Sequence, residues 1–110
     1  MAVKNEMKRI YPQSAEAIGQ VLRHPDFSQC LDVTYIEEAI TPEGTEFRYT
    51  RKTDMSRYGR NYFIKLVTLA DGQTEVTVTT QSRKVTVLWD IPWKKEVEKA
   101  FGFIDMLLRR

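Results

Sequence analysis

His24 and Cys30 are the one histidine and the one cysteine of the chain, and a thiol beside an imidazole can act as a nucleophilic pair. The two residues flank a predicted loop between a helix and a strand, so they could approach each other. A catalytic dyad would also need a third group to orient the imidazole. A histidine at a helix end more often interacts with the helix dipole, and a single cysteine more often packs as a small apolar residue. We therefore do not expect a dyad.

Other catalytic arrangements are also missing from the sequence. Glu37 and Glu38 are neighbours on a predicted strand, so their carboxylates point to opposite faces and cannot act as a direct acid–base pair. The five glycines are isolated, which excludes a glycine-rich phosphate loop, and no metal-ligand spacing of His, Cys, Asp or Glu occurs. We expect a protein that is not an enzyme and holds neither a metal nor another cofactor.

A long C-terminal helix is the clearest structural element that the sequence predicts. Asp90 can cap it, and Pro92 fits its first turn, where a missing N–H is tolerated. Apolar residues recur along it at steps of three and four, and this stripe must face an apolar surface. The residues of the stripe are Trp93, Val97, Ala100, Phe101, Ile104, Leu107 and Leu108.

The remainder of the chain reads mainly as strands, preceded by one short helix that Ser14 caps and His24-Pro25 ends. The segment Tyr62–Ala70 is apolar on both faces, which is typical of a strand in the middle of a sheet. Alternating polar and apolar residues predict the other strands. The predicted strands are Met7–Tyr11, Cys30–Ile40, Thr45–Arg51, Tyr62–Ala70, Thr74–Thr80 and a continuation or short last strand over Val85–Trp89.

These elements predict a single α+β domain over residues 1–110 with two layers. We expect an antiparallel meander of four to six strands, with the short N-terminal helix and the long C-terminal helix packed on one face. Trp93 and Phe101 on the helix, with Phe47 and Tyr49 on the sheet, would then meet between the layers. They either line a cavity for an apolar ligand or simply fill the core.

The predicted meander separates charge between its two ends, although the net charge is only +2. The turns at Thr41–Gly44 and Asp71-Gly72 lie at one end, which is rich in glutamate. Basic side chains gather at the other end, where they form a site for phosphate or another anion, or are merely solvated strand ends. These residues are Arg51, Lys52, Arg57, Arg60, Arg83 and Lys84, and the sequence opposes them only with Asp54.

Partners and location follow from what the sequence contains and lacks. No RNA- or DNA-binding signature accompanies the basic residues, so a nucleic acid is not expected as a partner. The segment Tyr62–Ala70 leaves one apolar set on the outer sheet face, either Phe63, Val67 and Leu69 or the opposite set Tyr62, Ile64 and Leu66, which favours a protein partner or self-association. The charged N-terminus lacks the apolar core of a signal peptide, and no segment is apolar enough to insert into a membrane. We expect a soluble, cytoplasmic protein.

The segment Thr74–Leu108 resembles the end of small bacterial α+β domains of uncharacterised function. It has a Thr/Val strand, then Trp89-Asp90, then Lys94-Lys95-Glu96-Val97-Glu98, then an aliphatic helix. Those domains have the order strand, helix, several strands, helix, and are comparable with TBP-like or helix-grip-like domains. The resemblance implies this fold and transfers no catalytic residue.

Our leading hypothesis from the sequence is a non-enzymatic binding or protein-interaction module that uses the basic end of the sheet for an anionic partner. The alternative is a small carrier of an apolar ligand, held between the sheet and the C-terminal helix.

Overall fold

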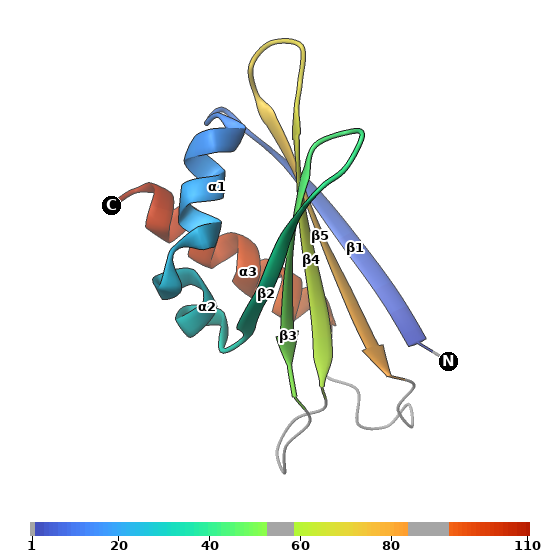
Figure 1. Ribbon diagram of the computed structural model, residues 1–110. Coiled ribbons are helices and arrows are strands. Elements are labelled where there is room, and N and C mark those ends of the chain that lie inside the picture. The colour runs from blue at the N-terminus through green and yellow to red at the C-terminus, as the bar shows by residue number, and fades with distance from the viewer. Residues whose placement is uncertain (1, 53–58, 84–92) are drawn as a thin grey trace.

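A sheet covered on one face by helices forms the protein (Figure 1). The computed structural model describes residues 2–52, 59–83 and 93–110. Along the chain the elements are β1 (Ala2–Tyr11), α1 (Ala15–Arg23), α2 (Pro25–Leu31), β2 (Thr34–Ile40), β3 (Thr45–Arg51), β4 (Arg60–Thr68), β5 (Thr74–Arg83) and α3 (Trp93–Leu108). The predicted two-layer α+β architecture is confirmed.

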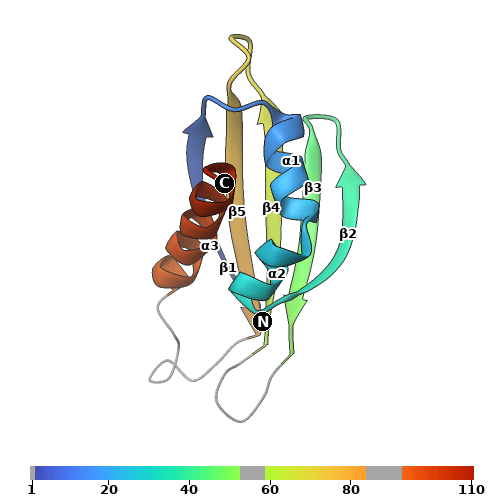
Figure 2. The ribbon, with the colours of Figure 1, turned by 90° about the vertical axis from the view of Figure 1, so that its left-hand side faces the viewer.

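The sheet has five strands in the order β1-β5-β4-β3-β2, and every neighbouring pair is antiparallel. Strands β2 to β5 form the predicted meander, and β4 occupies the central position that its two apolar faces indicate. Strand β1 pairs with β5, at the far side from β2, so α1 and α2 connect opposite edges of the sheet. In Figure 2, α3 lies over β1 and β5, and α1 and α2 lie over β4 and β3.

A second short helix is the main difference from the predicted elements. Pro25 ends α1, as expected, but it also opens α2, because a residue in the first helical turn needs no N–H donor. His24 caps this helix, with its Nδ1 accepting a hydrogen bond from the backbone N–H of Asp26 at 3.1 Å. Cys30 and Leu31, predicted as the start of a strand, are therefore helical, and that prediction was wrong.

Several strand boundaries also differ from the predicted ones. Strand β1 begins at Ala2 instead of Met7, and β5 continues to Arg83. Strand β4 begins at Arg60, whereas the sequence placed its start at Tyr62 and left the preceding residues in a loop. The predicted strand Val85–Trp89, the Asp90 cap and Pro92 lie outside the described residues.

The core lies between the sheet and the helices, where alternate residues of each strand meet the apolar stripe of α3. Cross-strand neighbours on the inner face form rows: Phe47 lies opposite Ile64, Tyr49 opposite Tyr62, and Arg51 opposite Arg60. The first two rows are apolar or aromatic and fully buried. The third row, at the end of the sheet, brings two arginines to the same inner face.

The glycines Gly44 and Gly102 provide a matched test of local packing. A Cβ at Gly44 would lie 1.9 Å from the backbone oxygen of Leu66, whereas one at Gly102, inside α3, meets nothing within 4 Å. We expect Gly44→Ala to lower the free energy of unfolding by about 1–3 kcal/mol because the backbone must move. Gly102→Ala should raise it by about 0.5–1 kcal/mol, since alanine loses less conformational freedom in a helix. Urea unfolding of both variants measures the two effects, and similar values for both would contradict this packing.

Candidate functional site

Two of the predicted basic residues, Arg51 and Arg60, come together at the end of the sheet where β3 and β4 are connected. They are direct cross-strand neighbours, and only 7% and 5% of their surfaces are exposed. The sequence suggested solvated strand ends as one interpretation, but the alternation that places Tyr49 and Tyr62 inward also turns these arginines inward. Lys52, the next residue along, is exposed. Arg57, Lys84 and the side chain of Arg83 lie outside the described part of the structure.

Glu96, in the first turn of α3, lies opposite Arg51 inside this corner of the core. Its Oε1 is 3.6 Å from Nη2 of Arg51, and the two side chains are 9% and 6% exposed. Its Oε2 accepts a hydrogen bond from the Tyr62 hydroxyl at 2.9 Å. Burial raises the pKa of Tyr62 and the Glu96 charge raises it further, so this hydroxyl stays protonated and donates at neutral pH.

The Arg51 guanidinium keeps unused hydrogen-bonding capacity although it is buried. Within the described ranges, neither its Nε nor its Nη2 donates a hydrogen bond. The guanidinium carbon lies 5.9 Å from the centre of the Tyr62 ring, within the range of a cation–π contact. A buried charged donor without an acceptor is unfavourable by more than the roughly 1–3 kcal/mol of a neutral one. Glu96 balances the charge of Arg51, while two of the buried guanidinium nitrogens make no hydrogen bond among the described residues.

The hydroxyl of Thr80 adds a second unused polar group nearby. Thr80 is the cross-strand neighbour of Tyr62 on β5 and is 1% exposed. Its Oγ1 has no hydrogen-bond partner among the residues that the structure describes. Unpartnered buried polar atoms are rare in folded proteins and call for an explanation, such as a ligand or an ordered water molecule. Two such side chains within this one corner mark it as unusual.

A surface depression of 340 Å³ reaches Arg51 and Arg60 from the solvent, and we call it the basic hollow. It lies at the end of the sheet that points downward in Figure 1. The lining residues are Thr50, Arg51, Lys52, Gly59, Arg60, Asn61 and Gln81. Every charged residue of this described lining is a cation, so the hollow favours negatively charged groups.

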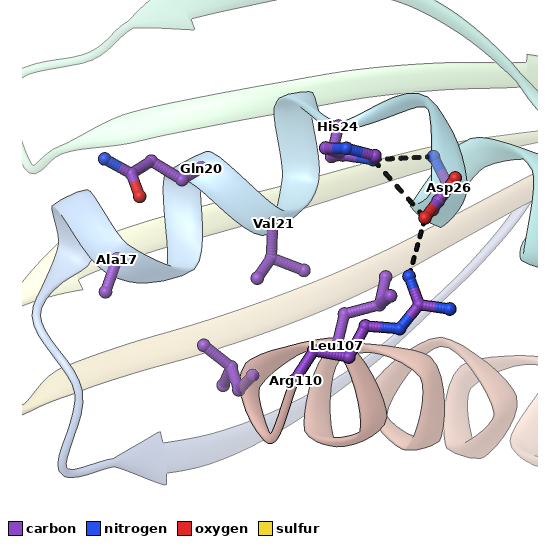
Figure 3. A pocket seen from close by; sticks show the side chains of 8 residues that line it. Ala17, Gln20, Val21, His24, Asp26, Leu107 and Arg110 are labelled. Carbon is purple, nitrogen blue, oxygen red and sulfur yellow. Dashed lines mark hydrogen bonds and ion pairs between the residues drawn. The ribbon is translucent and has the colours of Figure 1, made fainter.

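A larger depression of 420 Å³ lies between α1 and the C-terminal end of α3, and Figure 3 shows its lining. Val21 and Leu107 contribute to an apolar floor, and polar groups form part of the rim. Several of these polar groups already have partners: Arg110 Nη1 contacts Asp26 Oδ2 at 2.6 Å, and His24 accepts from the Asp26 backbone. Asp26 and Arg110 of the larger depression thus form an ion pair with each other, whereas Arg51 of the basic hollow pairs with Glu96, which does not line that hollow.

The four residues predicted to line an apolar cavity are in part core residues. Phe47, Tyr49 and Phe101 are buried, and Tyr49 donates a hydrogen bond to the backbone oxygen of Leu22 at 2.7 Å. The ring of Tyr49 also packs edge-on against Phe27, with 5.5 Å between the centroids. The side chain of Trp93 lies outside what the structure describes. The three described side chains contribute to the packed core, and whether an apolar ligand binds there stays a prediction.

Glu96 was not among the site residues predicted from the sequence, although the sequence contains a signal for it. Glu96 follows Trp93 by three residues and precedes Ala100 by four, so it lies within the apolar stripe of the helix. A carboxylate inside such a stripe must find a partner on the surface that the stripe covers. The same argument applies to Arg51, which continues the inward alternation of Phe47 and Tyr49.

Two further findings concern the described residues alone. Within 2–52, 59–83 and 93–110, no group of three or more His, Cys, Asp and Glu residues is arranged to hold a metal ion. In the same ranges, no helix has the length and apolar character needed to cross a lipid bilayer.

Comparison with known proteins relates this chain to others by fold alone. No family model and no curated protein matches the sequence. Among solved structures, Ara h 8.0201 superimposes with a TM-score of 0.62 at 12% identity, covering 98% of both chains. The protein of unknown function EF2215 from Enterococcus faecalis superimposes with a TM-score of 0.53 at 13% identity, and the match covers 94% of this chain and 69% of that one. TTHA0849 from Thermus thermophilus superimposes with a TM-score of 0.50 at 13% identity, and the match covers 96% of this chain and 97% of that one. The chain therefore has a small α+β fold with a C-terminal helix that proteins of very different sequence share.

Proposed function

We propose that this protein is a binding module that takes an anionic ligand into the basic hollow, with Arg51 as the central contact. The observation that carries the proposal is the buried guanidinium of Arg51, a residue that lines a solvent-connected depression. Its Nε and Nη2 lack hydrogen-bond partners among the described residues. Arg60 beside it and Lys52 at the rim add positive charge. The module acts without catalysis, in the cytoplasm, and belongs with the small bacterial α+β domains, comparable with TBP-like or helix-grip-like domains, that its sequence resembles.

A carrier of an apolar ligand has less support. The side chains that would line its cavity, Phe47, Tyr49 and Phe101, are at most 1% exposed and pack against their neighbours. Binding of a protein partner or a second copy to the outer sheet face stays a prediction from the sequence. On that face Phe63 and Val67 are half-buried, as the alternation indicates, and they line a depression of 360 Å³.

Anion titrations followed by amide NMR test the proposed function. Sodium acetate and sodium phosphate, each compared with sodium chloride at equal ionic strength, serve as probes. We expect saturable shifts of the backbone amides of residues 50–52 and 59–61 with at least one of the two anions. Shifts concentrated around Val21 and Leu107, or no saturable shift with either anion, would contradict the proposal.

Charge reversal at the rim gives a second, independent measurement. Lys52→Glu should weaken anion binding by roughly three- to tenfold, because a rim charge contributes to attraction without being buried. The free energy of unfolding should change by no more than about 0.5 kcal/mol, as for most surface substitutions. Lys99→Glu, on the exposed face of α3, is the matched control and should leave anion binding unchanged.

A further inference from the structure

We infer that the two edges of the sheet bind each other in successive copies of the protein, with β1 of one copy pairing in parallel with β2 of the next. Within the described sheet, β1 and β2 are the strands that have a neighbour on one side only. The inference concerns a surface at both edges of the sheet, and it does not depend on the basic hollow or on the proposed function.

Exposed apolar side chains are concentrated on these two edge strands. Among the residues that the structure describes, five large hydrophobic side chains are exposed, and four of them lie on the edges. These four are Ile10 on β1, which is 58% exposed, and Tyr35, Ile36 and Ile40 on β2, of which Ile40 is 91% exposed. Apolar side chains on an unpaired edge favour the addition of another strand. Association through the edges would remove these side chains from water.

The charges that the two edges expose are opposite in sign. Lys8 and Arg9 are exposed on β1, and Glu37 and Glu38 are exposed on β2. Each of the four has an ionic partner in its own chain, but at these exposed positions it can interact with a further charge: the pairs are Lys8 with Glu75, Arg9 with Asp105, Glu37 with Arg48, and Glu38 with Arg23. No cation occurs in Thr34–Ile40, so two copies of β2 would bring glutamates together, whereas β1 beside β2 brings opposite charges together.

One register matches the two strands over four positions and on both faces. Strands β1 and β2 run in the same direction, because five strands alternate between them, so their pairing across copies is parallel. On the outer face Lys8 would lie beside Glu37, and on the inner face Arg9 would lie beside Glu38, as their neighbours in the sheet show. The complete set of pairs is Lys8 with Glu37, Arg9 with Glu38, Ile10 with Ala39, and Tyr11 with Ile40. The bulge between Tyr35 and Glu37 ends this regular stretch.

The backbone of β2 presents free groups along the same stretch. Thr41 and Gly44 exchange two hydrogen bonds, with N to O distances of 2.7 and 3.2 Å. Bonded and non-bonded pairs alternate along an antiparallel ladder, so the N–H groups of Glu38 and Ile40 point away from β3. These groups can bond to an added strand.

The helices leave room for the next copy. In Figure 2, α3 lies over β1 and β5, and α1 lies over β4 and β3, so neither helix is centred on β2. With strands about 4.8 Å apart, α1 of one copy would lie three spacings, about 14 Å, from α3 of the next. Packed helices need only about 8–10 Å between their axes. The remaining space would hold inner-face side chains such as Ile40.

Sedimentation velocity of the intact protein tests the inference, at concentrations from about 10 μM to about 1 mM, which suit a small interface. We expect the average mass to rise with concentration and to exceed that of a dimer, because each added copy presents another free edge. A mass that stays at the 12.9 kDa of one chain would overturn the inference. An association that stops at two copies would also overturn it, because it would indicate a two-fold contact.

Two charge reversals identify which strands meet. Lys8→Glu alone and Glu37→Lys alone each place like charges across the contact, so association should require at least about fivefold higher concentration. An equimolar mixture of the two variants should associate like the wild type, since every β1 then finds a β2 of opposite charge. Lys99→Glu changes the net charge by the same amount as Lys8→Glu, but on the exposed face of α3, and should associate like the wild type. If the mixture associates no better than either variant alone, β1 and β2 do not pair and the inference fails.

A proline at the free edge tests the role of the backbone. Ile40→Pro removes an N–H group that points away from β3, so it should abolish association while leaving the hydrogen bonds between β2 and β3 intact. Ile40→Val keeps this N–H group and should associate like the wild type. Association of a folded Ile40→Pro variant at wild-type concentrations would contradict pairing through β2. If far-UV circular dichroism shows that Ile40→Pro does not fold, the mixture of charge-reversed variants decides by itself.

Discussion

Phe101→Ala is expected to lower the free energy of unfolding by about 3–5 kcal/mol, the usual range for truncating a buried phenylalanine. Phe101 is fully buried where α3 crosses β1 and β5. Its ring stacks on Tyr11 with 6.5 Å between centroids, and the Arg9 guanidinium lies 4.5 Å from the ring centre. The substitution removes all of these contacts and leaves a cavity that the packed layers cannot fully close.

Urea unfolding measures this loss. The slope of the unfolding free energy against urea concentration should be the same in the variant as in the wild type. Phe103→Ala is the matched control, because Phe103 is two residues away on the same helix but only half-buried. Its loss should be about 1–2 kcal/mol, in proportion to the smaller area removed from water. Equal losses for the two variants would contradict the assigned orientation of α3.

The same variant tests the carrier hypothesis. If Phe101 lines a ligand cavity, its removal must change the affinity for an apolar probe such as N-phenyl-1-naphthylamine, whose fluorescence reports binding. If it belongs to the packed core alone, the substitution lowers stability and leaves probe binding unaltered. We expect the second result, because Phe101 on the helix and Phe47 and Tyr49 on the sheet are all buried in the same hydrophobic core.

The sequence predicted those parts of the fold that depend on a strictly periodic pattern. The stripe from Val97 to Leu108 identified α3 and its buried face, and the two apolar faces around Ile64 identified the central strand. In both cases the period alone decides which side chains are buried, whatever lies opposite them. The predicted placement of the helices on one face followed from the same patterns.

The additional helix α2 escaped prediction for a local reason. His24-Pro25 was interpreted only as the end of a helix, but proline is equally suited to begin one. The helix has only seven residues, too few for a clear apolar period, and Leu31 and Val33 also fit an alternating strand. A short segment of this kind is decided by its contacts with α3 and β2 more than by its own pattern.

The candidate site was predicted only in part, because some of its residues lie far apart in the sequence and meet only in the folded protein. The predicted antiparallel meander placed basic residues together at one end of the sheet, and Arg51 and Arg60 are neighbours there. Their burial and their approach to Glu96 depend on how α3 lies across the sheet, which no local spacing encodes. Glu96 is 45 residues from Arg51 (96 minus 51), and only the packed structure brings the two side chains together.

The protein is expected to lose stability steeply above pH 10, because three buried tyrosines cannot ionise in the folded state. Burial is the main cause that raises the pKa of Tyr11, Tyr49 and Tyr62 above the ordinary value near 10. Each also donates a hydrogen bond, to Asp105, the Leu22 backbone and Glu96 respectively. The unfolded chain releases these three protons near pH 10, whereas the folded protein retains them.

A group whose pKa is higher in the folded state than in the unfolded state stabilises the folded protein. This stabilisation is complete at pH values below the unfolded-state pKa, and it is lost as the pH rises above that value. Each tyrosine contributes about 1.4 kcal/mol per pH unit, so the three together should remove about 4 kcal/mol per unit above pH 10. Since small domains are stable by only about 5–15 kcal/mol, unfolding should follow within a few pH units. Urea unfolding at successive pH values, followed by far-UV circular dichroism, measures the slope.

Single tyrosine variants assign this slope to particular side chains. Tyr49→Phe removes one titrating group from the core, so the loss above pH 10 should fall from about 4 to about 2.7 kcal/mol per pH unit. Tyr35→Phe is the control, because Tyr35 packs against Tyr49 but is 41% exposed, and its hydroxyl ionises with much less hindrance. A slope in Tyr49→Phe equal to that of the wild type would mean that Tyr49 already ionises in the folded protein. The inner face of the sheet would then be open to solvent there, and the packed core on which both the site and its alternative depend would have to be revised.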